Sequence, residues 1–258
     1  MTTYLFGDTD IAAQRLRLVA EAYGEATRAF VHGCGLQQPG LVVDLGCGPG
    51  YSTRLLAEVL QGTHTVGLDN SVHFIALAQQ EPMAQVAFHC HDVERVPFPM
   101  PPAEVLFCRL LLTHLAQPQD MLTRWATQIQ PHGRLLIQEV EWIHTNNATF
   151  TTYLEMQQTT LARQAHCLYI GPVLDAMPGP DLLQRRMSRV QRVPVAPAHV
   201  ATMFWLNFQT WKHHPTVQTQ FATAQLTRLE DDLRQLADAT RSEVEIVWGL
   251  RELVYERL

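Results

Sequence analysis

The sequence predicts an α/β fold: a seven-stranded, mostly parallel sheet with helices on both faces and a helical cap. Two observations carry this prediction. Short apolar runs alternate with segments of helical periodicity through the first 145 residues. A glycine-rich turn, Gly46-Cys47-Gly48-Pro49-Gly50, then joins the first apolar run to a helical segment. A strand, a glycine turn and a helix in this order present backbone N–H groups to a ligand at the carboxyl edge of a parallel sheet.

The chain ahead of this turn is predicted to form one amphipathic helix over residues 8–33. Its apolar residues recur every three or four positions, Asp8 or Thr9 can cap its start, and Gly33 can end it. The first strand follows at 41–45. Further helices are expected at 51–60 and 118–130, and the next strands at 63–69, 86–91, 103–108 and 134–140.

The alternation stops beyond Trp142. Gly171-Pro172 is expected to mark a turn, and a short helix is expected to begin at Asp181. The remaining elements are predicted as helices at 147–166, 198–213 and 215–237 and strands at 187–195 and 244–248. The sequence thus divides into a helical leader or lid (1–35), an α/β core (36–145), a helical cap insertion that includes the sixth strand (146–240), and a last strand that completes the sheet (241–258).

Composition narrows the function classes. Lys and Arg total 19 of 258 residues and the formal net charge is −6, so the basic footprint that a nucleic-acid partner requires is missing. No apolar run approaches the ~20 residues that cross a bilayer, and the first ten residues lack a secretory signal. The five cysteines include no C-x-x-C pair. We expect a cytoplasmic protein that binds neither nucleic acid nor membrane.

The run Val42 to Gly50, V-V-D-L-G-C-G-P-G, resembles the first motif of class I S-adenosylmethionine-dependent methyltransferases. The opening Tyr4 to Asp10, followed by Arg15-Leu16, is similar to the leader of a bacterial subgroup of small-molecule methyltransferases. The resemblance implies a Rossmann-like fold, S-adenosyl-L-methionine as cofactor and S-adenosyl-L-homocysteine as product. It also implies O-, N- or C-methylation of a small, partly hydrophobic metabolite, as in secondary metabolism.

The resemblance also implies cofactor positions. Asp44 would face the ammonium of the methionine part, Asp69 would accept both ribose hydroxyls, and Asp92 would accept the adenine amine. Arg109 is expected to pair with a carboxylate, either that of the cofactor, that of Asp44 or an unrelated one. The expected cofactor residues are Tyr4, Asp44, Gly46, Cys47, Gly48, Gly50, Asp69, Asn70, Asp92, Val93 and Arg109.

Candidate substrate residues follow the fourth and fifth strands. His114 is a candidate general base because its ordinary pKa lies near neutrality, although it could simply pack. Glu139 and Glu141 could bind a substrate amine or hydroxyl, or hold the leader. Aromatic and methionine side chains after residue 141 suggest an adaptable apolar pocket or a dimer contact. The expected substrate residues are Glu139, Glu141, Trp142, Met203 and Trp205.

Two alternatives remain beside a methyltransferase: an enzyme of the same fold that uses the cofactor for a cyclisation or isomerisation without methyl transfer, and a nucleotide-binding module. The missing G-x-G-x-x-G motif opposes the module. A metal site around His89, Cys90 and His91 is not expected, because alternate side chains of a strand point to opposite faces.

Overall fold

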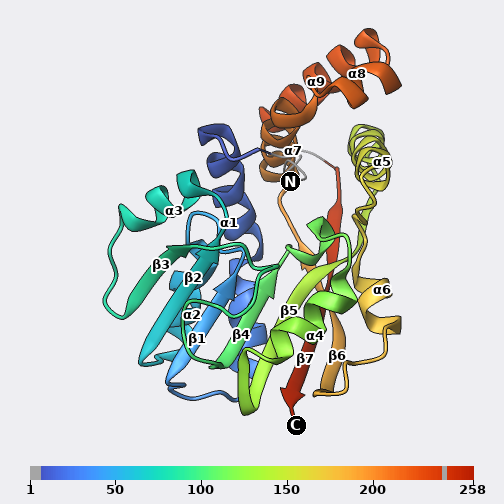
Figure 1. Cartoon of the computed structure of the whole chain (residues 1–258). Coiled ribbons are helices and arrows are strands. Elements are labelled where there is room, and N and C mark those ends of the chain that lie inside the picture. Colours follow the sequence, from blue (N-terminus) through green and yellow to red (C-terminus); the bar gives the residue numbers. More distant parts are fainter. Residues whose placement is uncertain (1–6, 240–242) are drawn as a thin grey trace.

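The computed structural model describes residues 7–239 and 243–258. Its centre is a sheet of seven strands in the order β3-β2-β1-β4-β5-β7-β6 (Figure 1). The five strands from β3 to β5 are parallel, and β7 runs antiparallel between β5 and β6. The α/β prediction, with a mostly parallel sheet of seven strands and helices on both faces, is confirmed.

The first half of the chain follows the predicted alternation, but the fifth strand, expected at 134–140, covers residues 129–145, and the helix expected over 118–130 ends at Ala126. Residues buried on both sheet faces explain why these strands read as continuous apolar runs. The elements are α1 (Asp10–Gly33), β1 (Leu41–Leu45), α2 (Tyr51–Leu60), β2 (His64–Asp69), α3 (Val72–Gln79), β3 (Val86–Cys90), β4 (Ala103–Arg109), a 3₁₀ turn (Leu112–His114), α4 (Pro118–Ala126) and β5 (Ile129–Thr145).

The second half contains the cap and the antiparallel end of the sheet. In Figure 1, α5 and α7 to α9 lie above the end of the sheet where the parallel strands finish. The elements are α5 (Ala148–Ala162), α6 (Gly171–Ala176), β6 (Leu183–Pro194), α7 (Pro197–Trp211), α8 (Pro215–Gln220), α9 (Thr223–Ala237) and β7 (Ile246–Arg257).

Three details of the predicted cap are wrong. Gly171-Pro172 starts α6 instead of marking a turn, because proline is tolerated in the first turn of a helix, where its missing N–H is not needed. Residues 181 and 182 form no helix: β6 begins at Leu183, which pairs with Arg257 of β7. The helix expected over 215–237 is two helices, α8 and α9, with Phe221 and Ala222 extended between them.

Apolar side chains form layers on both faces of the sheet and a further cluster within the cap. The cap cluster joins α1, α5, α7 and α9 to the ends of β5 and β7, and α1 packs directly on α7. The first helix therefore belongs to the cap as well as to the sheet. Within the described residues, no helix is both long and apolar enough to cross a membrane.

Candidate functional site

The glycine turn between β1 and α2 requires glycine for reasons of conformation and space. Gly46, Gly48 and Gly50 have φ angles of 68°, 53° and 85°, which disfavour any side chain. A Cβ on Gly46 would stand 2.9 Å from Leu111, and one on Gly50 would stand 2.6 Å from Phe88. The turn is therefore a close backbone approach at the carboxyl edge of the sheet, as the sequence predicted.

Asp44 lies at the base of this turn and is almost fully buried. Its Oδ2 accepts hydrogen bonds of 2.7 Å from the hydroxyls of Ser52 and Thr53, in the first turn of α2. Burial raises the pKa of Asp44 to about 6, while these hydrogen bonds and the charge of Arg109 act in the opposite direction. The carboxylate thus fixes the start of α2 against the end of β1, beside the glycine turn.

Asp69 ends β2 and faces the same turn. Its Oδ2 accepts the Gly48 N–H at 2.8 Å, and its Oδ1 accepts the Ser71 N–H at 2.8 Å. Burial raises the pKa of Asp69, and these two backbone hydrogen bonds oppose that rise. The hydroxyl of Ser71 caps α3 by accepting the Phe74 N–H. Asp69 is therefore not the cap of α3 and stands at the rim of the turn, where the sequence placed it.

Asp92 reaches the same edge through the end of β3. The N–H of His91 donates to the carbonyl of Asp69 at 2.8 Å, so the ends of β2 and β3 lie side by side. The Asp92 carboxylate accepts the Glu94 N–H at 3.0 Å and lies 3.3 Å from Arg95, while Val93 is buried in the core. Three acids from three adjacent strands therefore line this edge.

Arg109 ends β4 and begins a chain of buried polar side chains. Its guanidinium donates to the Thr27 hydroxyl at 3.1 Å, and that hydroxyl donates to Gln138 at 2.7 Å. Gln138 donates to Glu252, which pairs with Arg189 at 2.7 Å. Burial lowers the pKa of Arg109. Sequence reasoning missed this chain, although an uncharged polar residue within the apolar strand Arg134 to Val140 was a usable signal.

A cavity of about 120 Å³ lies beside the glycine turn, between α1, the segment after β4, β5, α5, α7 and β7. Leu16 of α1 lines it and comes within 3.4 Å of where a Cβ of Gly48 would stand. Leu110, which also lines the cavity, is the chain neighbour of Leu111, the side chain against Gly46. The cavity and the turn are therefore adjacent compartments.

The cavity receives two of the residues predicted for substrate or catalysis, His114 and Met203. Burial, together with the positive charge of Arg15, lowers the pKa of His114 to about 3, so its imidazole is neutral near pH 7. Trp142 stacks on His144 at 4.3 Å, and Trp205 lies beneath the Arg234 guanidinium at 5.2 Å. Neither tryptophan lines the cavity.

Glu139 is completely buried within β5. Its Oε1 accepts the N–H groups of Leu111 and Leu112, both at 2.7 Å. Burial raises the pKa of Glu139 to about 8, against the effect of these hydrogen bonds. Glu139 therefore holds the segment whose Leu111 side chain covers Gly46. Glu139 is not among the described residues that line the cavity.

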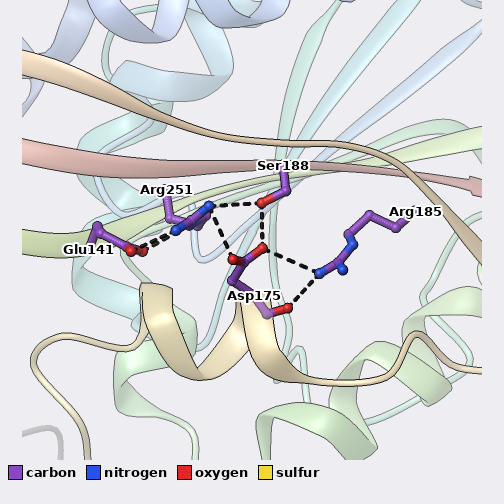
Figure 2. Close-up of polar contacts among 5 residues, drawn as sticks. All are labelled: Glu141, Asp175, Arg185, Ser188 and Arg251. Carbon is purple, nitrogen blue, oxygen red and sulfur yellow. Dashed lines mark hydrogen bonds and ion pairs between the residues drawn. The ribbon is translucent and has the colours of Figure 1, made fainter.

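Glu141 has a separate partner, because β5 is irregular between Val140 and Trp142. Its carboxylate accepts two hydrogen bonds from Arg251, one from Nη2 at 2.6 Å and one from Nε at 2.8 Å (Figure 2). Arg251 also donates to Ser188 at 2.9 Å and lies 3.5 Å from Asp175, which pairs in turn with Arg185. This network, the α6 clamp, fastens α6 to β5, β6 and β7 and lies outside the cavity lining.

Sequence reasoning also missed Asn207, a polar residue of the cavity. Asn207 donates to the Tyr153 hydroxyl at 2.6 Å, and its buried Oδ1 has no hydrogen-bond partner among the described residues. Asn207 stands between Leu206 and Phe208 in an apolar stretch of α7, which was the available signal. Tyr4 lies outside the described residues. Within residues 7–239 and 243–258, no group of His, Cys, Asp or Glu is arranged to hold a metal ion.

Comparisons with known proteins find a methyltransferase domain in this chain and methyltransferases among the proteins similar to it. Residues 42–133 match the model of a methyltransferase domain. The chain is 39% identical over 127 residues to a trans-aconitate 2-methyltransferase of Methylobacterium nodulans, which covers 49% of this chain and 48% of that one. It is 35% identical over 105 residues to the enzyme of the same name from Delftia acidovorans, covering 40% and 39%. The chain thus matches about half the length, or less, of these curated relatives.

Solved structures share the fold at low identity. Coclaurine N-methyltransferase superposes with a TM-score of 0.55 at 14% identity, covering 92% of this chain and 73% of that one. The plantazolicin methyltransferase BpumL gives 0.52 at 11%, covering 98% and 93%. The [4+2]-cyclase SpnF gives 0.53 at 13%, covering 92% and 81%. At such identities the likeness shows the fold alone.

Proposed function

We propose that the chain, whose residues 42–133 match the model of a methyltransferase domain, is a class I S-adenosylmethionine-dependent methyltransferase that methylates a small molecule held in the cavity beneath its cap. The adjacency of the cavity and the glycine turn carries this proposal. Leu16 contacts both compartments, so a donor at the turn and an acceptor in the cavity would meet.

The residues at the turn fit the cofactor. The three glycines of the turn have positive φ angles, and the carboxylates of Asp69 and Asp92 stand at the ends of adjacent strands beside it. Asp44 and the backbone from Gly46 to Gly50 would hold the amino-acid end of S-adenosylmethionine. Asp69 with Asn70 would hold the ribose, and Asp92 with Val93 the adenine. When bound, the cofactor supplies a methyl group already activated on a sulfonium.

The protein then contributes orientation and exclusion of water, which suffice for much of the rate of an in-line displacement. Apolar walls of the cavity, such as Val19 and Phe204, keep water from the acceptor. His114 is neutral at its wall, so it could accept a hydrogen bond from an acceptor O–H or N–H. We propose His114 in that role, with the proton passing to it only as the acceptor reacts.

Titration calorimetry with S-adenosylhomocysteine tests the cofactor site, and we expect saturable one-to-one binding. Incubation with S-adenosylmethionine and a metabolite library then tests the reaction, with release of S-adenosylhomocysteine as the readout. Absence of binding at millimolar S-adenosylhomocysteine would reject the proposal.

The same assay separates the second candidate, a conversion that keeps the cofactor intact. The likeness to a [4+2]-cyclase shows that this fold also accommodates such chemistry in another protein. A new product formed without an equivalent of S-adenosylhomocysteine would favour this candidate over methyl transfer.

A further inference from the structure

The described lining of the cavity combines one arginine, Arg15, with mostly apolar walls. We infer that its natural ligand is a small organic acid with a single carboxylate and an aromatic or aliphatic body, held with the carboxylate against Arg15. The role of this acid as methyl acceptor rests on the proposed function, whereas the binding preference follows from the cavity itself. This acid differs from the tricarboxylate for which the curated relatives are named.

Arg15 supplies the charge. Among the described residues that line the cavity, it is the only Asp, Glu, Lys or Arg. It is 8% exposed, so little water screens its guanidinium. Its positive charge acts to lower the pKa of Tyr23, His114 and Tyr153, all of which line the cavity. A planar guanidinium can donate two parallel hydrogen bonds to one carboxylate.

The remaining walls favour an apolar body. Phe204 stacks on Tyr153 at 4.0 Å and meets Trp248 edge-on at 6.0 Å. Met203, from the same helix as Phe204, can adapt to the shape of a ligand. The volume is about 120 Å³, and apolar cavities of roughly 150 Å³ bind benzene. One ring or a short chain therefore matches this space.

A second or third carboxylate would lack a cationic partner here. His114 is neutral near pH 7, and the other polar groups of the lining, such as Gln157 and Asn207, carry no charge. An unpaired charge in an apolar site costs several kcal/mol or forces a change of protonation. The tricarboxylate for which the relatives are named would therefore fit this cavity worse than a monocarboxylate with a ring.

Calorimetry with three probes on enzyme saturated with S-adenosylhomocysteine tests the inference. Benzoate has one carboxylate and one ring, benzamide is its neutral counterpart, and trans-aconitate carries three carboxylates. We expect benzoate to bind at least about tenfold more tightly than benzamide, from a charge-assisted hydrogen-bond pair, and more tightly than trans-aconitate.

Variants on one helix show whether Arg15 is responsible. Arg15→Met should abolish the preference for benzoate over benzamide, and Arg15→Lys should keep part of it. Arg17→Met is the matched control, because Arg17 lies on the exposed side of α1 with Glu21 at 2.9 Å, and it should keep the full preference. Retained binding of S-adenosylhomocysteine by each variant shows that the fold is intact.

Equal binding of benzoate and benzamide would overturn the inference. So would tightest binding of trans-aconitate, or binding of none of the probes by enzyme that does bind S-adenosylhomocysteine. A preference for benzoate in a protein that does not bind S-adenosylhomocysteine would support the inference and reject the proposed function, so the two failures are distinguishable.

Discussion

At the scale of single residues, the site depends on carboxylates that each accept two hydrogen bonds from the protein's own donors. Asp44 binds two hydroxyls, Asp69 two backbone N–H groups and Glu139 two more. Each carboxylate joins a strand to a neighbouring segment of the chain, so the donor groups orient the acids before any ligand arrives. This preorganisation lowers the cost of ordering the site when a ligand binds.

Replacing Asp69 should weaken cofactor binding. Asp69→Ala removes a carboxylate at the rim of the glycine turn and frees the Gly48 N–H that it holds. We expect the affinity for S-adenosylhomocysteine, measured by calorimetry, to fall about tenfold or more through lost hydrogen bonds. Asp231→Ala, on the exposed surface of α9, is the control. Unchanged affinity in Asp69→Ala would remove this residue from the cofactor site.

Glu139 should make stability depend on pH. Its pKa is about 8 in the folded protein against 4.5 for an ordinary glutamate, so between these values the folded state binds more protons than the unfolded one. The free energy of unfolding should therefore fall as pH rises from about 4.5 to 8, by at most about 1.4 kcal/mol per pH unit for one group.

The Glu139→Gln variant isolates this contribution, because glutamine cannot titrate and all other groups are shared. Urea unfolding of both proteins at pH 5, 6, 7 and 8 should show the wild type losing stability relative to the variant. A difference between the two proteins that stays constant over this range would contradict the raised pKa.

The sequence predicted the residues at the turn but not their partners. Asp44, Asp69 and Asp92 stand out because each follows an apolar run, and parallel strands bring their carboxyl ends to one edge. The partners of Glu139 are backbone N–H groups 28 and 27 residues earlier, and the partner of Glu141 depends on the irregularity of β5 and on pairing with β7, 110 residues later. Spacing along the chain carries no information about such long-range register.

At the scale of elements, the α6 clamp attaches one short helix to three strands (Figure 2). The side chains of Arg251 and Glu141 are 11% and 12% exposed, so their two hydrogen bonds are largely shielded from water. Arg251→Met should leave Glu141 without its cation and destabilise the protein by about 3 kcal/mol.

Chemical unfolding measures that loss. Arg228→Met removes another arginine from an ion pair, but Arg228 is 84% exposed, so the change should stay within about 0.5 kcal/mol. Similar losses in the two variants would show that the clamp contributes no more than a surface pair.

The prediction of helices and strands succeeded where local sequence signals were strong. It failed where pairing between distant strands determines the structure. Tyr51 to Leu60 was predicted as a helix because periodicity and the glycine turn agreed. The segment from Asp181 was wrongly predicted as a helix, because pairing with β7 draws residues from Leu183 into a strand whatever their local preference.

At the scale of the whole molecule, the turn and the cavity belong to different layers. The turn lies on the sheet, while the cavity closes only when α1, α5 and α7 pack together. Sequence reasoning could predict the turn from one contiguous motif. It could not predict the cavity, whose lining comes from Arg15 at one end of the chain to Trp248 at the other.

A larger side chain in the cavity should impair methyl transfer without weakening cofactor binding. Met203→Trp adds bulk at the cavity wall, so an acceptor should be displaced and methyl transfer should fall about a hundredfold, as small misplacements of reactants do. S-adenosylhomocysteine affinity should stay within about twofold, since the turn is untouched. Met203→Leu, which conserves volume, is the control. Loss of both properties in Met203→Trp alone would show that the compartments are not independent.

The position of β7 has a consequence for the order in which the protein can be assembled during synthesis. This strand, Ile246–Arg257, lies between β5 and β6 and pairs with both. The parallel strands from β3 to β5 can join as each leaves the ribosome, but β5 and β6 present unpaired edges until residue 246 and its successors are made. Because open edges recruit other strands, ribosomes that stall late on this message should yield a product that aggregates rather than a partly active enzyme.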